Sequence, residues 1–175
     1  MKYLKLIVVF LVLISCSNKG EKEANALLSK SFFLEKSIKE INTINVQDAF
    51  SKYQQNIELV KKCVNAIENE FARRMNNYKG LKRACPNFLT SYDLTKRNLE
   101  TEINQLKMLR LDLSNNLVPK DSIRYYIEME EKNVQKISDD LLDVLTLYDF
   151  VISTSDSLYL PIMDYAEKEC SKNEI

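Results

Sequence analysis

Apolar side chains recur along most of this chain in steps of three and four residues, which is the spacing of an amphipathic helix. The pattern predicts helices over about 22–42, 46–79 and 87–116, and a fourth from about 121 onward. The second segment is the most regular, and its heptad spacing is typical of the seam between long paired helices. Its stripe consists of Phe50, Tyr53, Ile57, Val60, Val64, Ile67 and Phe71.

The third and fourth segments carry stripes of the same kind. The third stripe is interrupted by Arg110. It is formed by Leu99, Ile103, Leu106, Leu113 and Leu117. The fourth stripe is formed by Ile123, Ile127, Val134, Ile137, Leu141, Leu145, Tyr148 and Ile152.

Short connections separate the predicted helices. Gly80 is expected to end the second helix, and Pro86 to permit the start of the third. A turn is expected around Asn116, and Pro161 can open a short last helix that ends near residue 171. Because short connections make consecutive helices antiparallel neighbours, the pattern predicts an all-α fold. We expect an elongated antiparallel up-down helical bundle of three long helices, with a shorter N-terminal and a short C-terminal helix.

The first residues follow a different pattern. Lys2 and Lys5 precede an apolar run, and residues 6–18 carry no charge. Thirteen residues are too few to span a bilayer, which needs about 20, but their arrangement fits a secretory signal segment. The run ends in Leu13-Ile14-Ser15-Cys16, which resembles the lipobox of bacterial lipoproteins.

This resemblance covers only about the first 20 residues, and it implies an anchoring chemistry. Residues 1–15 would be removed as a signal peptide, and the sulfur of Cys16 would carry a diacylglyceryl group. Two or more acyl chains hold a protein stably on a membrane. The resemblance therefore implies a lipid-anchored protein of the bacterial cell envelope, with the outer membrane as the expected location. The polar segment 16–25 is interpreted as a tether, and residues 26–171 as the helical domain.

Charge and cysteine content limit the classes of partner. The chain has 25 basic and 25 acidic residues, and loss of Lys2 and Lys5 with the signal leaves a net charge of −2. Nothing in this balance favours binding to nucleic acid. Three cysteines remain besides Cys16, and an oxidising compartment would allow one pair and one free thiol.

The helix boundaries favour a disulfide between Cys85 and Cys170. Cys85 lies in the predicted turn after Gly80, and the C-terminal tail should return to the same end of the bundle. Cys63 would lie about 25 Å below that turn, at 1.5 Å per residue. A pair between Cys63 and Cys170 stays open if the last helix folds back, as do three reduced cysteines.

Few catalytic groups are available. The chain has no His and only two Gly, so it cannot form a Ser-His-Asp triad or a glycine-rich phosphate loop. The spacing of Cys and acidic residues predicts neither a metal nor another cofactor. Dense carboxylates at 128–131 and 139–143 are interpreted as solvated surface, although a catalytic pair is conceivable.

Charge is unevenly placed along the chain. Residues 61–97 contain nine basic and three acidic residues, whereas residues 128–169 contain eleven acidic and three basic ones. These segments could simply complement each other within the bundle. Alternatively, the basic end could bind an anionic polymer or an acidic partner. The candidate residues are Arg73, Arg74, Lys79, Lys82 and Arg83.

These observations lead to three hypotheses. The first is a non-enzymatic scaffold or partner-binding module that contacts another envelope protein. The second is a bundle that binds an anionic glycan or a small ligand, which a pocket with convergent polar groups would favour. The third is a hydrolase that uses only carboxylates, which a deep acidic pair with a raised pKa would favour.

Overall fold

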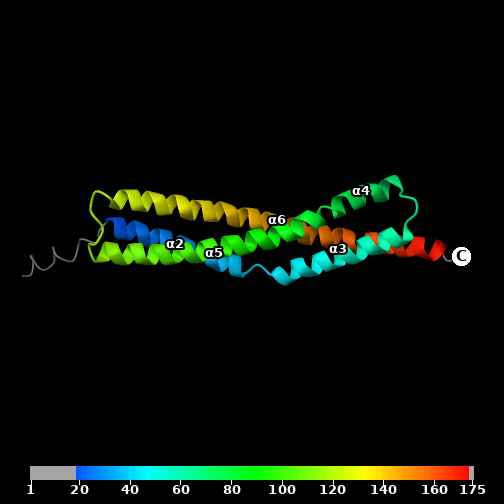
Figure 1. Cartoon of the computed structure of the whole chain (residues 1–175), viewed down its shortest axis with the longest axis horizontal. Coiled ribbons are helices and arrows are strands. Elements are labelled where there is room, and N and C mark those ends of the chain that lie inside the picture. Colours follow the sequence, from blue (N-terminus) through cyan, green and yellow to red (C-terminus); the bar gives the residue numbers. More distant parts are fainter. Residues whose placement is uncertain (1–18, 174–175) are drawn as a thin grey trace, which may run out of the picture. The chain divides into compact units, whose positions relative to one another are not determined.

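The computed structural model describes residues 19–173, and this part of the chain is helical with no strand. Five helices follow one another (Figure 1): α2 Lys19–Lys39, α3 Thr43–Cys63, α4 Asn69–Tyr78, α5 Leu81–Ser114 and α6 Ile123–Asn173. The predicted all-α class is therefore confirmed. None of these helices is both long enough and apolar enough to cross a membrane.

The helices belong to two compact units. Unit 1 contains residues 19–36 and 97–138, so it consists of most of α2, the second half of α5 and the first part of α6. Unit 2 contains residues 37–96 and 139–173, with α3, α4, the first half of α5 and the rest of α6. Both long helices thus contribute to both units.

Unit 1 is held together at one end by small side chains. Ala24 of α2 is buried together with Leu113 of α5 and Ile127 of α6. A Cβ atom added at Gly20 would lie 2.5 Å from Cγ2 of Ile123, so only glycine lets α2 approach α6 this closely. Gly20 and Ala24 are four residues apart and therefore share one face of α2.

The prediction of an unpacked tether up to residue 25 is therefore wrong for residues 19–25. They form the first turns of α2, and their small residues are buried. The segment is polar in composition because Glu21, Lys22 and Glu23 lie half-buried or exposed on the other faces of the helix. Residues 16–18 of the expected tether lie outside the described residues.

The end of α5 has a specific backbone cap. Asn116 adopts a left-handed φ of 56°, which asparagine tolerates better than most residues. The amide of Leu117 donates to the carbonyl of Asp112 at 2.9 Å, and the amide of Asn116 donates to that of Leu113 at 3.1 Å. These two bonds form a Schellman motif, so the turn expected here is confirmed.

The second predicted helix is in fact two. Helix α3 ends at Cys63, and α4 begins only at Asn69. Ile67, expected in the heptad seam, lies in the connection and is 58% exposed. The buried stripe of α3 is also rotated from the predicted one, and consists of Val46, Ala49, Tyr53, Asn56, Val60 and Cys63.

Two prolines expected to mark helix starts lie inside helices. Helix α5 begins at Leu81, so it contains Pro86, and α6 continues without interruption past Pro161 to Asn173. Each proline removes one backbone hydrogen bond, but neighbouring residues pack fully into the core. Cys85 and Phe88 are completely buried beside Pro86, as is Ile162 beside Pro161.

Contacts within unit 2 show how its helices run. Asn45 bonds to the hydroxyl of Tyr148, and Asn56 bonds to the carbonyl of Tyr159. The order is the same along both helices, so α3 runs parallel to this part of α6. The chain then reverses at 64–68, because Phe71 of α4 stacks on Tyr165 of α6.

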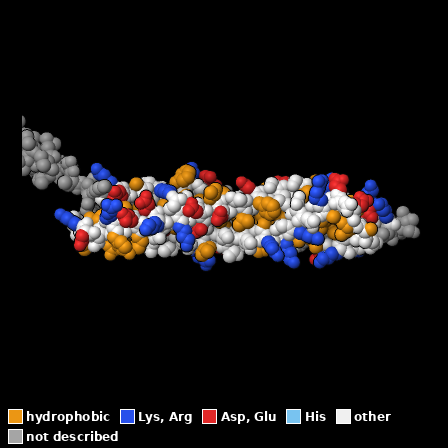
Figure 2. Space-filling model, turned by 90° about the horizontal axis from the view of Figure 1, so that it is seen from above, with side chains coloured by type: hydrophobic (Ala, Val, Ile, Leu, Met, Phe, Trp, Pro, Cys, Tyr) orange, Lys and Arg blue, Asp and Glu red, His pale blue; other side chains and the backbone are white. Residues whose placement is uncertain are grey.

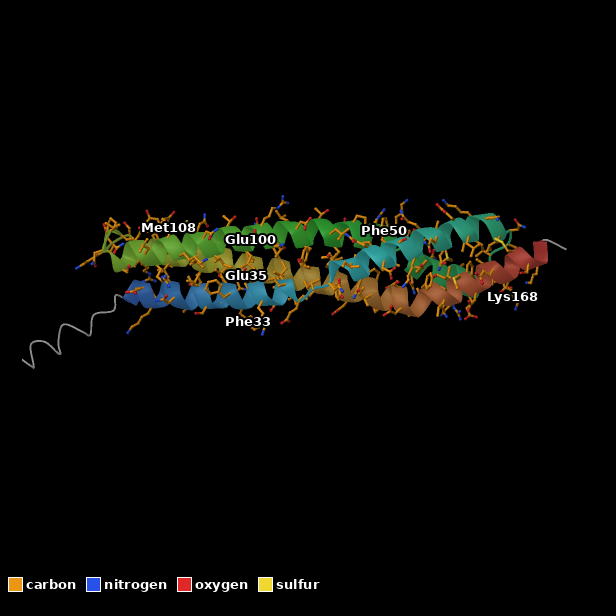
Figure 3. All side chains as sticks on the ribbon, turned by 90° about the horizontal axis from the view of Figure 1, so that it is seen from below. Phe33, Glu35, Phe50, Glu100, Met108 and Lys168 are labelled. Atoms are coloured by element: carbon orange, nitrogen blue, oxygen red, sulfur yellow. A yellow bond between two sulfur atoms is a disulfide. The ribbon has the colours of Figure 1, made fainter. Side chains whose placement is uncertain are left out.

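The disulfide joins Cys63 to Cys170, with Cα atoms 4.5 Å apart, and is drawn as a yellow bond in Figure 3. Cys85 is a buried free thiol. The predicted pairing of Cys85 with Cys170 is therefore wrong, and the alternative pairing is present. The error came from placing the reversal at Gly80. Since the chain reverses just after Cys63, that cysteine lies at the end where α6 terminates.

Candidate functional site

Two buried glutamates face each other in unit 1. Glu102 of α5 lies between Leu99 and Leu106, and Glu130 of α6 lies between Ile127 and Val134. Glu102 is only 3% exposed and Glu130 only 7%. Helical spacing places both in the core stripes of their helices, so the fold brings two carboxyl groups together where apolar side chains are expected.

The pKa of the Glu102 carboxyl group lies far above its ordinary value. Burial, followed by the charge of Glu130 and a hydrogen bond to it, raises the pKa of Glu102 from 4.5 to about 8. At neutral pH Glu102 therefore keeps its proton and forms a hydrogen bond with Glu130. The side-chain amide of Asn133 also donates to Glu130 at 2.9 Å.

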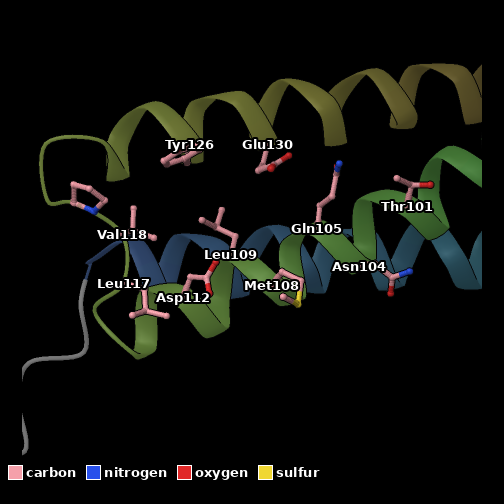
Figure 4. Close-up of a pocket in the computed structure, with 11 residues that line it drawn as sticks. Thr101, Asn104, Gln105, Met108, Leu109, Asp112, Leu117, Val118, Tyr126 and Glu130 are labelled. Carbon is pink, nitrogen blue, oxygen red and sulfur yellow. The ribbon is translucent and has the colours of Figure 1, made fainter.

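A groove of about 640 Å³ opens between α5 and α6 beside this pair (Figure 4). Tyr126 and Glu130 extend from α6 toward α5, and Leu109 and Gln105 extend from α5 toward α6. The connection after α5 closes one end with Val118. Its lining is completed by Thr101, Asn104, Met108, Asp112, Leu117 and Pro119.

All the charged side chains that line this groove are acidic. Glu130 and Asp112 supply carboxyl groups, and no lysine or arginine lines it. The walls near the α5 end are apolar, and at the rim Met108 is 59% exposed. A volume of this size falls within the range of small-molecule sites, which combine apolar walls with a few polar groups.

A second cavity of unit 1 lies between α2 and α6, with a volume of about 520 Å³. It is lined by charges of both signs, among them Glu23, Lys120 and Arg124. Arg124 forms an ion pair with Glu128 at 2.6 Å, four residues further along α6. This cavity therefore differs from the groove, whose charged lining residues are all acidic.

The buried polar groups of unit 2 satisfy one another. The side-chain amide of Asn56 donates to the hydroxyl of Tyr78 at 3.3 Å and to the carbonyl of Tyr159 at 2.8 Å. Burial raises the pKa of Tyr78 to about 12 and that of Cys85 to about 11. A thiol that stays protonated is a poor nucleophile, so this cluster has a structural role.

The predicted basic patch lies on α4 and the start of α5, and all its residues are exposed. Arg74 is held by Glu70, four residues before it. Glu68, Glu70 and Arg74 line a small cavity of about 100 Å³ with Phe71, Pro161 and Tyr165. Acidic and basic side chains both spread over the face in Figure 2. The patch Arg73, Arg74, Lys79, Lys82 and Arg83 stays a prediction.

The interpretation of the dense carboxylates as solvated surface is wrong for Glu130. The signal was present in the sequence, because the fourth stripe skips from Ile127 to Val134 and residue 130 falls in the gap. Glu102 likewise precedes Ile103 within the third stripe. Lipidation at Cys16 falls outside the described residues.

Among residues 19–173, no group of three or more Cys, Asp or Glu residues could hold a metal ion. No protein-family model, no curated protein and no solved structure matches this chain.

Proposed function

We propose that this protein is a lipid-anchored binding protein of the bacterial cell envelope, with the outer membrane as its location. Its helical domain is non-enzymatic, and the groove of unit 1 is its binding surface. The observation that carries this proposal is the groove itself, which combines apolar walls with a buried carboxylate. The lipid on Cys16 would hold the domain at the membrane.

The disulfide between Cys63 and Cys170 supports a location outside the cytoplasm. Disulfides persist in oxidising compartments such as the periplasm, and are rare where thiols are kept reduced. This support is independent of the lipobox, because Cys63 and Cys170 belong to α3 and α6 and not to the N-terminal segment.

Substituting Cys16 with Ser is expected to abolish lipid attachment, because the hydroxyl of serine cannot replace the thiol that accepts the diacylglyceryl group. Cells that express each protein are labelled with radioactive palmitate, and the protein is recovered by immunoprecipitation. Cys85→Ser serves as the control and should keep full labelling. Equal labelling of the Cys16→Ser and unaltered proteins would remove the basis for the anchor.

Occupancy of the groove can be tested in intact cells. A photoreactive amino acid at position 108, on the exposed rim of the groove, should give covalent adducts after irradiation. The same amino acid at position 132, exposed on α6 but not part of the groove lining, is the control. Mass spectrometry then reads the mass of any adduct. If position 108 gives no more adduct than position 132, the groove is not the binding surface.

The geometry supports binding over hydrolysis. Carboxylate-dependent glycosidases hold their two carboxyl groups about 5–10 Å apart, on either side of the bond to be cleaved. Here Glu102 and Glu130 are hydrogen-bonded to each other, and Glu102 does not line the groove. No substrate bond fits between them.

Two finer expectations from the sequence stay predictions. One is the elongated up-down arrangement of the whole bundle. The other is the binding of an anionic polymer or acidic partner by the basic residues of α4 and α5. The groove has the opposite charge, so the two surfaces would bind different ligands.

A further inference from the structure

Glu130 places a carboxyl group at a position of α6 where packing favours an apolar side chain. It is nine-tenths buried, and within the described residues it forms no ion pair. A buried carboxylate without a basic partner destabilises the folded state. Since Glu130 also lines the groove, a positive charge could reach it from there.

Glu102 adds a second buried carboxyl group beside Glu130. Burial and the neighbouring Glu130 raise the pKa of Glu102 to about 8, so Glu102 keeps its proton at neutral pH. The Oε1 atom of Glu102 is buried and has no hydrogen-bond partner among the described residues. This arrangement is incomplete for a purely structural pair, because it leaves a buried carboxyl group without a basic partner and an unused acceptor in the core.

The remaining lining fits the apolar part of a ligand. Leu109, Val118 and Pro119 form apolar walls, and Met108 and Leu117 are exposed at the rim. Tyr126 lies four residues before Glu130 on α6, so its ring and the carboxylate share one face of the helix. An aromatic ring beside a carboxylate is a favourable environment for an organic cation.

We propose that the groove of unit 1 binds a small organic cation, an ammonium or guanidinium group on an apolar stem, with Glu130 as its counter-ion. This inference rests on the proposed function and specifies its ligand class. Charge complementarity selects this occupant, because Glu130 and Asp112 line the groove without any basic residue. An anionic ligand would be repelled, and a neutral one would leave Glu130 unpaired.

The test uses three probes with the same stem: hexylammonium, hexanol and hexanoate. Each is titrated into the purified protein, and the methyl NMR signals of Met108, Leu109 and Val118 are followed. Hexylammonium should shift these signals saturably and bind at least tenfold more tightly than hexanol. Hexanoate should bind more weakly than either.

Variants assign the preference to Glu130. Glu130→Gln should bring hexylammonium within about twofold of hexanol, whereas Glu100→Gln, an exposed acid of α5, should leave the preference unchanged. Met108→Lys places a cation on the exposed rim and should expel hexylammonium, while Met108→Gln should not. This second pair of variants lies on the surface, so it also decides the question if Glu130→Gln fails to fold.

Three results would overturn the inference. The first is equal affinity for hexylammonium and hexanol. The second is a preference for hexylammonium that survives in Glu130→Gln. The third is a lysine-rich amphipathic peptide that binds the groove and excludes hexylammonium, because the ligand would then be a peptide and not a small cation. If position 108 gives adducts in cells but the three probes bind with equal affinity, the ligand is not a cation and the proposed function still holds. Absence of adducts and of probe binding would reject both.

Discussion

Glu102→Gln is expected to make the protein more stable than the unaltered chain at pH 8 and about equally stable at pH 5. The pKa of Glu102 is raised from 4.5 to about 8 in the folded state, mainly by burial. The folded state therefore holds this proton more tightly than the unfolded state does. Its contribution to stability is fully present below pH 4.5 and is lost as the pH rises toward 8.

The expected loss over this range is on the order of 3 kcal/mol. Glutamine does not titrate, and its amide can still donate a hydrogen bond to Glu130. Few other groups interfere, because the chain has no His. Urea denaturation of both proteins at half-unit steps from pH 5 to pH 8 measures the difference directly.

Glu100→Gln is the matched control for this experiment. It lies two residues earlier on the same helix, is exposed, and makes the same change of charge. Its stability should fall with pH in parallel with that of the unaltered protein. If Glu102→Gln also follows that parallel course, the pKa of Glu102 is not raised in the folded protein.

Removal of the disulfide should cause a loss of similar size in unit 2. The bond joins residues 107 positions apart, and closing a loop of that length stabilises the folded state by about 4 kcal/mol. The double variant Cys63→Ala/Cys170→Ala should therefore denature at a clearly lower urea concentration. The unaltered protein treated with dithiothreitol should show the same shift.

Cys85→Ala is the control for this prediction. It removes a buried sulfur and leaves a small cavity, at a cost of about 1 kcal/mol, but it retains the disulfide. It should therefore keep the response to dithiothreitol, which the double variant lacks. Loss of the response in Cys85→Ala instead would show that Cys85 takes part in the bond in solution.

The sequence by itself determined the fold class and part of the core. Apolar residues recur in steps of three and four, which favours helices, and the chain has only two glycines and three prolines to interrupt them. The stripes from Leu99 to Leu113 and from Ile127 to Leu141 were predicted and are buried. Leu117, predicted to continue the third stripe, is exposed beyond the cap at Asn116.

Only the tertiary structure decided where the chain reverses. Val64, Ile67 and Phe71 continue the heptad spacing of α3 through the break, so periodicity could not distinguish one helix from two. Gly80 does mark a helix end, because α4 stops at Tyr78 and α5 begins at Leu81. Pro86 lies inside α5, where burial of Cys85 and Phe88 outweighs its local signal. The position of the reversal then decided which cysteine meets Cys170.

The site also depended on contacts that periodicity does not contain. The sequence shows that Glu102 and Glu130 each lie on an apolar stripe, but not that the two stripes place them against each other. A carboxylate on a helix is exposed to solvent unless a neighbouring helix packs over it. Packing of α5 on α6 supplies that cover, removes water from both groups, and so raises the pKa that makes the pair distinctive.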